Sequence, residues 1–326
     1  MGVNPHKSTQ IVKQLQYING EDIDIERWDT IVREMDGALV TNFSWYLDCV
    51  ADEWDALVYG DYEILLPVPI SIKAFNYKVV YQPFFLRTLQ LISPKTEITP
   101  EISNNFLEAL SQRFKLIHFN LDKPIDTPKN WKKINYPFQV LPLEDDFEKL
   151  YQGFSKNAKR LINKAKKEGL QVSETQSHRY IADKFYELSG EKINVITREH
   201  INSLGHLFEV SNNQEVGKSY VVTDAQGEII AGAHFLYFKG RITYLKGFIE
   251  DGAKQSGAMH FLFYKIINQH HQRYDILDFD GSKIEGVAQF YKKFGAVDNH
   301  YYGMKLNTLP YFLKAIRFLK SSTKIS

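Results

Sequence analysis

The chain has 326 residues, a hydrophobic fraction of 44% and nearly balanced charge, with 40 Lys and Arg against 39 Asp and Glu. This length predicts two domains, and the balanced charge excludes a protein that coats nucleic acid, so we expect no stable nucleic-acid complex. No apolar run approaches the roughly eighteen residues of a membrane span, and the first residues lack the apolar core of a signal peptide, which predicts a cytoplasmic protein. Cys49 is the only cysteine, which excludes an internal disulfide and a cysteine-based zinc site.

Residues 1–143 alternate between strand and helix patterns and are expected to form the first domain. Apolar residues at helical spacing predict a helix near 42–53, and two apolar runs around Gly60 and Asp61 predict an antiparallel hairpin. Residues 124–142 contain four prolines, carry few signs of regular structure at their start and resemble a connector. The other expected elements are strand 11–15, helix 26–35, strand 79–85, helix 103–114 and strand 116–121.

Residues 144–308 are expected to form the second domain, followed by a tail at 309–326. A long amphipathic helix is predicted at 147–167 and a shorter one near 180–188. Three consecutive antiparallel strands follow, and then a helix, a strand, a helix and a last strand. Their expected ranges are 218–223, 229–238, 241–248, 258–272, 274–279, 287–294 and 301–306.

The most informative stretch is 278–296. It combines the end of a buried strand, a glycine turn and a short amphipathic helix with almost no linker. Val287, Phe290, Tyr291 and Phe294 recur at helical spacing, and Gly295 ends the helix.

The order of these elements, with a glycine-bearing loop between the third strand and a helix, resembles the GNAT acyltransferase fold. The basic segment 155–172 is similar to the start of the second domain of FemABX-type aminoacyltransferases, and 278–296 is similar to that family's closing strand and helix. The resemblance implies an α/β (α+β) fold of two GNAT-like domains, each a mixed, mainly antiparallel sheet flanked by helices. The chain departs from the family by lacking a helical coiled-coil arm and by a spacing one residue shorter at 291–294.

This resemblance also implies a transferase that passes an acyl or aminoacyl group from a thioester or ester donor to an amine. Donor and acceptor would meet in a groove between the domains, without a metal or a tightly bound cofactor. Acyl-CoA and aminoacyl-tRNA are the candidate donors, and an anionic small molecule or a peptidoglycan-precursor-like molecule is the candidate acceptor. The alternative is a non-catalytic GNAT-like module that binds an anionic ligand.

A basic helix is the candidate anion site. From Ser155 to Lys167, six of thirteen residues are basic and none is acidic. Helical geometry places most of them opposite the apolar stripe, where they can follow a diphosphate or an RNA backbone. The predicted substrate-binding residues on this helix are Lys156, Asn157, Arg160 and Lys164. A solvated helix face explains the same pattern.

Three residues are predicted to carry the chemistry. Lys292, with Lys293 as its substitute, would stabilise the tetrahedral oxyanion, and Tyr291 would protonate the leaving group. Asp278 and Asp280 point to opposite faces of their strand, so one of them is expected beside the groove as the base, and we choose Asp280. Glu285, Glu228 and His234 are the other candidates for the base. A surface lysine and a core tyrosine are the alternative interpretations of Lys292 and Tyr291.

The remaining candidate residues lie on loops and strand ends. Residues 251–258 precede a helix at the place where GNAT enzymes bind the pyrophosphate of CoA, which makes Gln255, Ser256 and Gly257 the candidate cofactor-binding residues. Tyr81 and Gln82 resemble a strand end of GNAT-like proteins, and Tyr244 lies on the third strand of the second domain; these three complete the substrate-binding set.

The pattern of residues 309–320 in the tail predicts a short basic amphipathic helix. It suits a transient contact with a membrane surface, which would place the protein at the inner membrane face. Packing against its own domain is the alternative.

Overall fold

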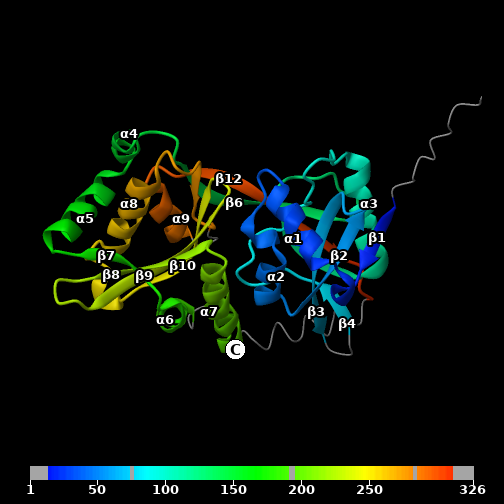
Figure 1. Cartoon of the computed structure of the whole chain (residues 1–326), viewed down its shortest axis with the longest axis horizontal. Coiled ribbons are helices and arrows are strands. Elements are labelled where there is room, and N and C mark those ends of the chain that lie inside the picture. Colours follow the sequence, from blue (N-terminus) through cyan, green and yellow to red (C-terminus); the bar gives the residue numbers. More distant parts are fainter. Residues whose placement is uncertain (1–13, 74–76, 191–194, 282–284, 311–326) are drawn as a thin grey trace, which may run out of the picture.

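The structure is a computed structural model that describes residues 14–73, 77–190, 195–281 and 285–310. These residues form one mixed sheet of 12 strands, in the order β1-β2-β3-β4-β5-β12-β6-β11-β10-β9-β8-β7, with helices on both faces (Figure 1). The strands are β1 (Leu15–Ile18), β2 (Glu53–Tyr59), β3 (Ile64–Lys73), β4 (Tyr77–Val80), β5 (Leu116–Leu121), β6 (Lys132–Pro142), β7 (Gln171–Thr175), β8 (Gly217–Thr223), β9 (Ile229–Phe238), β10 (Arg241–Ile249), β11 (Ile276–Asp278) and β12 (Val297–Asn307). The helices are α1 (Ile25–Glu34), α2 (Ser44–Val50), α3 (Pro100–Arg113), α4 (Phe147–Gln152), α5 (Lys156–Lys167), α6 (His178–Phe185), α7 (Arg198–Asn213), α8 (Ala258–His270) and α9 (Glu285–Lys292). The predicted α/β class with a mainly antiparallel sheet is confirmed.

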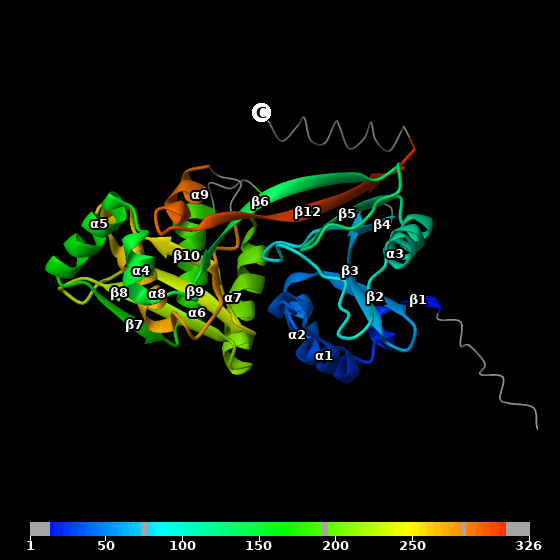
Figure 2. The ribbon, with the colours of Figure 1, turned by 90° about the horizontal axis from the view of Figure 1, so that it is seen from above.

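In the first half, α1 and α2 lie on one side of the strands and α3 lies on the other (Figure 2). The predicted hairpin is confirmed, because β2 and β3 pair antiparallel from Glu53 with Ile70 to Tyr59 with Ile64. The first strand was expected at 11–15; β1 begins at Leu15, and residues 1–13 lie outside the described residues.

Two long strands join the halves (Figure 2). β12 pairs antiparallel with β5 of the first half and with β6, and the carboxyl end of β6 pairs with β11 of the second half. The two expected sheets are therefore continuous. The expected connector at 124–142 is irregular only at its start, because it forms β6 from Lys132 onward. Ile134, Tyr136, Phe138 and Val140 alternate along this strand, but its prolines favoured the prediction of a connector.

In the second half, the three consecutive strands are confirmed as the antiparallel β8, β9 and β10. The helix expected at 147–167 is two helices. The first ends at Gly153, and the side chain of Ser155 accepts a hydrogen bond from the amide of Ala158 and so begins the second. α7 was not predicted, although Thr197 and His200 form a capping box at its start.

The core consists of two large apolar clusters. One belongs to the first half and also takes in α6 and α7, through residues such as Ile181, Phe185, Leu204 and Phe208. α7 of the second half packs against α2 of the first half, so the contact between these two helices attaches the two halves to each other. The other cluster lies among α5, α8, α9 and the opposite face of the second half of the sheet.

Candidate active site

The two strands β10 and β11 separate and leave an opening in the sheet. They pair in parallel only over Arg241–Thr243, and a register shift in β10 follows between Tyr244 and Lys246. A cavity of about 360 Å³ occupies the opening. Its lining is mainly apolar and aromatic, with residues from β10, α8 and α9: Ser189, Tyr244, Gly247, Phe248, Ile249, Lys254, Gly257, Ala258, Met259, His260, Gly286, Val287, Phe290 and Tyr291.

Two tyrosines line this opening on the side of α8. Tyr244 lies edge-on to Phe263 of α8, and its ring centroid is 6.2 Å from that of Tyr291. Tyr291 in turn stacks on Phe279 at 4.5 Å. Burial raises the pKa of both hydroxyls, and the charge of Asp280 raises both further, so both are neutral proton donors at pH 7.

The amino-terminal end of α8 closes the cavity and lies against the basic helix α5. Gly257 has a φ of 83°, and a Cβ there would lie 2.4 Å from the backbone oxygen of Leu161, so only glycine fits. Lys164 Nζ donates to the Gln255 backbone oxygen at 2.8 Å, which ties α5 to the loop before α8. The hydroxyl of Ser256 accepts from the amide of Ala258 at 3.1 Å.

His260 lies in the first turn of α8 and lines the cavity, and two positively charged side chains lie near it. Burial, together with the nearby charges of Lys293 and Arg160, lowers its pKa to about 4. Its Nε2 atom is buried without a hydrogen-bond partner. A helix amino terminus with two neighbouring cations favours an anionic ligand group at this end of the cavity.

A cluster of buried charges lies on the opposite face of the sheet, because adjacent residues of a strand point to opposite faces. Both guanidinium nitrogens of Arg87 donate to the carboxylate of Asp278, at 2.7 and 2.6 Å, and Arg241 donates to it at 2.6 Å. Asp280 lies 3.4 Å from both Arg87 and Lys246. Arg87 belongs to the first half of the chain, so this cluster fixes the two halves together.

The two aspartates of the cluster differ in their proton affinity. Burial alone would raise the pKa of Asp278, but the charges and hydrogen bonds of Arg87 and Arg241 together lower it, so it stays ionised. Burial raises the pKa of Asp280, and the more distant Lys246 and Arg87 only partly oppose this. Asp280 has a φ of 56°, and its amide donates to Asp278 at 2.9 Å, so Asp278 holds the turn that carries Asp280.

Arg87 is itself held by the loop after β4. The hydroxyl of Tyr46 donates to the backbone oxygen of Phe85 at 2.6 Å, and the side-chain amide of Gln82 donates to the backbone oxygen of Leu86. The side-chain amide of Asn120 donates to the backbone oxygen of Arg87 at 2.9 Å, and the Arg87 guanidinium lies 4.1 Å from the centroid of the Phe138 ring.

The structure brings together only part of the predicted site. Tyr244, Tyr291 and Gly257 line the opening, and Asp280 lies on its other side. Lys164 and Gln255 contact one another at the loop before α8, and the hydroxyl of Ser256 accepts from the amide of Ala258. Lys156, Asn157 and Arg160 lie on the exposed surface of α5, where Arg160 donates to Asn157 at 2.9 Å.

Other predicted residues lie away from the opening. Lys292 is exposed and forms a 2.6 Å ion pair with Asp298, and it does not line the cavity. The hydroxyl of Tyr81 accepts from the amide of Asp52 at 2.9 Å, and Gln82 supports the Arg87 loop. His234 is a fully buried core residue bonded to Ser211 and Ser219, so it is not available as a base. The tail at 311–326 lies outside the described residues.

Sequence reasoning missed Arg87, Arg241, Lys246 and His260. Arg87 carries no local signal, because its partner lies 191 residues later in the chain. Arg241 and Lys246 flank the predicted Tyr244 on the same strand, but the register shift that turns Lys246 toward Asp280 is not visible in the sequence.

Comparisons with known proteins identify the fold. No family model and no curated protein matches the sequence. Among solved structures, the chain is similar to FemX (12% identity, TM-score 0.65, covering 88% of this chain and 96% of that one). It is also similar to the C-terminal domain of a putative lysylphosphatidylglycerol synthetase from Agrobacterium fabrum (14%, 0.56, 92% and 95%) and to a tandem GNAT protein from the clavulanic acid biosynthesis pathway (11%, 0.51, 91% and 99%). The chain therefore has the FemABX and GNAT-like fold that its motifs predicted.

Two further findings concern membrane spans and metal sites. Within the described ranges, every helix is too short or too polar to cross a membrane. In the same part of the chain, no group of three or more His, Cys, Asp or Glu side chains is placed to hold a metal ion.

Proposed function

We propose that the protein transfers an acyl group from a thioester donor to an amine at the opening between β10 and β11. The observation that carries this proposal is the opening itself. It joins an apolar cavity, two neutral tyrosines and a cationic helix end on one face to a buried carboxylate on the other. The similarity to FemX and to a tandem GNAT protein supports the same reaction class.

The donor would enter from the side of α8. The apolar walls fit an acyl chain and its thioester, and the amino terminus of α8 with Arg160 and Lys293 fits the phosphates of a CoA thioester. An aminoacyl ester on tRNA is the second candidate donor, and it would use the exposed cations of α5, among them Lys156.

In the reaction, the amine nitrogen attacks the donor carbonyl, so a C–N bond forms and the C–S bond breaks. Asp280 takes the proton that the nitrogen loses. The cavity beside Asp280 measures about 20 Å³, which is room for about one water molecule to relay this proton. Tyr291 gives its proton to the departing thiolate, and the products are an amide and a free thiol.

Tyr291 lines the cavity and is suited to act as the acid, whereas Lys292 forms an ion pair with Asp298 at the surface. A role for Lys292 at the oxyanion therefore requires its ion pair to open. Asp280 is suited to act as the base because its raised pKa brings it closer to neutral pH than an exposed aspartate.

The test is thiol release from a panel of acyl-CoA donors with a panel of amines, with product amides identified by mass spectrometry. Tyr291→Phe and Asp280→Asn should each lower kcat about 100-fold. Tyr264→Phe and Asp145→Asn are matched controls outside the opening and should stay within two-fold. Ligand binding without thiol release from any donor would instead favour the non-catalytic binding module.

A further inference from the structure

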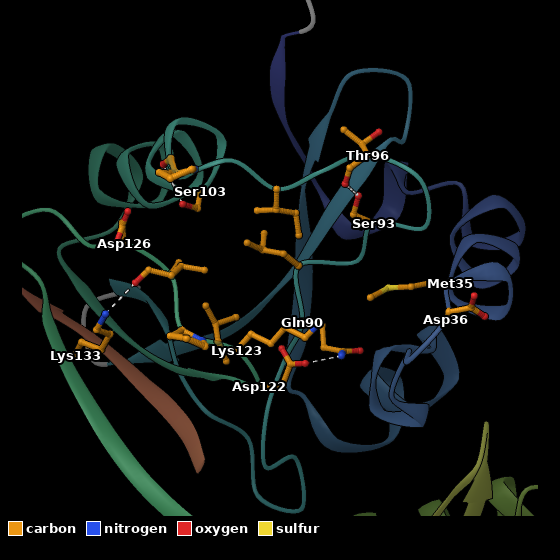
Figure 3. Close-up of a pocket in the computed structure, with 16 residues that line it drawn as sticks. Met35, Asp36, Gln90, Ser93, Thr96, Ser103, Asp122, Lys123, Asp126 and Lys133 are labelled. Atoms are coloured by element: carbon orange, nitrogen blue, oxygen red, sulfur yellow. Dashed lines mark hydrogen bonds between the residues drawn. The ribbon is translucent and has the colours of Figure 1, made fainter. Parts of the chain in front are cut away.

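A second cavity, of about 560 Å³, lies in the first half of the chain (Figure 3). It is larger than the cavity between β10 and β11, and it lies outside the proposed acyl-transfer site. Its walls come from the end of α1, the loop before α3, the first turns of α3 and the segment after β5. The lining residues are Met35, Asp36, Gln90, Leu91, Ser93, Thr96, Ile98, Pro100, Ser103, Leu121, Asp122, Lys123, Pro124, Ile125, Asp126 and Lys133.

This cavity occupies the same place in the first half as the opening does in the second. Each half contains a strand, a helix and a second strand that pairs in parallel with the first: β4-α3-β5 and β10-α8-β11. Each cavity touches the first turn of that helix and the chain that follows the second strand. Ligands bind in such crevices beyond the carboxyl ends of parallel strands.

The chemistry of the two helix ends is opposite. The first turn of α8 contains no acidic residue and lies beside Arg160 and Lys293. At α3, the side chain of Thr99 already accepts the amide of Ile102, Pro100 has no amide hydrogen, and Glu101 adds a negative charge. The first-half cavity therefore disfavours the anionic group that the second-half opening favours.

One carboxylate is built into the wall of the first-half cavity. Asp122 is largely buried and accepts a hydrogen bond from Gln90 Nε2 at 2.6 Å (Figure 3). Gln90 is fixed in turn, because its oxygen accepts from the amide of Leu39 at 2.8 Å and from Asn42 at 2.5 Å. Burial raises the pKa of Asp122, and the hydrogen bond from Gln90 and the charge of Lys123 oppose this only in part.

The two serine hydroxyls of the lining keep hydrogen-bond acceptors free. The hydroxyls of Ser93 and Ser103 donate to the backbone oxygens of Thr96 and Pro100, so their lone pairs remain. Lys133 Nζ donates to the backbone oxygen of Ile125 at 3.1 Å. Asp36 and Asp126 are exposed, and with Asp122 they give the lining three carboxylates against the two ammonium groups of Lys123 and Lys133. Carboxylate oxygens and hydroxyl lone pairs require a ligand that donates hydrogen bonds.

We propose that this cavity is a second ligand site, which binds an organic ammonium ion, with Asp122, Asp36 and Asp126 of its lining as the anionic partners. The proposal does not depend on acyl transfer, because it concerns binding in the other half of the molecule. An apolar lining with a few fixed acceptors suits a linear amine, whose methylene groups lie against Leu91, Ile98 and Ile125.

The test is isothermal titration calorimetry of the full chain with spermidine, and in parallel with neutral sorbitol and with inorganic pyrophosphate. Spermidine should bind one to one. Asp122→Asn with Asp126→Asn should raise its Kd at least ten-fold, and Asp36→Asn with Asp126→Asn, which leaves the bond to Gln90 intact, should do so at least five-fold. Glu144→Gln with Glu148→Gln removes the same charge from an exposed surface elsewhere and should change the Kd less than two-fold.

Three results would overturn the proposal. The first is an absence of spermidine binding. The second is an equal loss of affinity in the cavity and control variants, which would show only general attraction to negative charge. The third is binding of sorbitol or pyrophosphate that the Asp122 and Asp126 substitutions weaken.

Discussion

The bond between Arg87 and Asp278 allows a stability prediction, because it joins the two halves in the interior. Asp278 is fully buried and the side chain of Arg87 is only 11% exposed. Removing one partner of such a pair leaves the other charge uncompensated and costs about 3–5 kcal/mol. Arg241, which donates to Asp278 at 2.6 Å in the wild type, is retained in the Arg87→Met variant, so we expect the lower end, about 3 kcal/mol.

The assay is urea unfolding at pH 7, followed by the fluorescence of the four tryptophans, for Arg87→Met, Asp278→Asn and the double variant. The double variant should lose at least about 1 kcal/mol less than the two single losses together, because contacting residues couple. The pKa of Asp278 is lowered from 3.8, so its contribution is present above that pH and is lost below it. The difference between wild type and Arg87→Met should therefore persist down to about pH 3.8 and narrow as the pH falls below it. Additive losses within about 0.5 kcal/mol would refute the coupling of the halves through this pair.

Three further predictions follow from single positions. Gly257→Ala should lower the free energy of unfolding by about 2 kcal/mol in the same urea assay, because an L-residue is strained at its φ of 83° and its Cβ meets Leu161; an unchanged midpoint would contradict this packing. Burial is the main cause that lowers the pKa of His260 and of His270 from 6.5 to about 4. For each histidine, the free energy of unfolding should therefore fall by about 3 kcal/mol as the pH falls from 6.5 to 4. His270→Phe should flatten the measured pH dependence of the free energy of unfolding. Lys292→Ala should leave kcat within two-fold in the thiol-release assay, and a loss of ten-fold or more would return Lys292 to the mechanism.

Local patterns were sufficient for most of the second half of the fold. The glycine turns and apolar runs predicted β8, β9 and β10, and the helical spacing that includes Tyr291 predicted α9. β6 was missed because its prolines outweighed its alternation. α7 was missed because its stripe belongs to the first half's core, which no local pattern indicates.

The candidate site was predictable where it depended on local sequence and not where it depended on distant partners. Tyr244, Tyr291 and Gly257 were identified from strand, helix and loop context, and they meet in one cavity. Arg87 was not, because its role comes from a residue in the other half of the chain. Lys292 was selected from a motif that predicts the helix α9 but does not predict whether the Lys292 side chain points toward the cavity or toward solvent.

The most direct test of the proposed site blocks the opening between β10 and β11 without touching its polar groups. Val287 lines the cavity, and Val287→Trp should fill much of its 360 Å³. Calorimetry with a non-hydrolysable acyl-CoA thioether should show binding to the wild type that is weakened at least ten-fold in Val287→Trp and unchanged in Asp36→Asn, which alters only the first-half cavity. Equal binding to the wild type and Val287→Trp would contradict the assignment of this opening as the donor site.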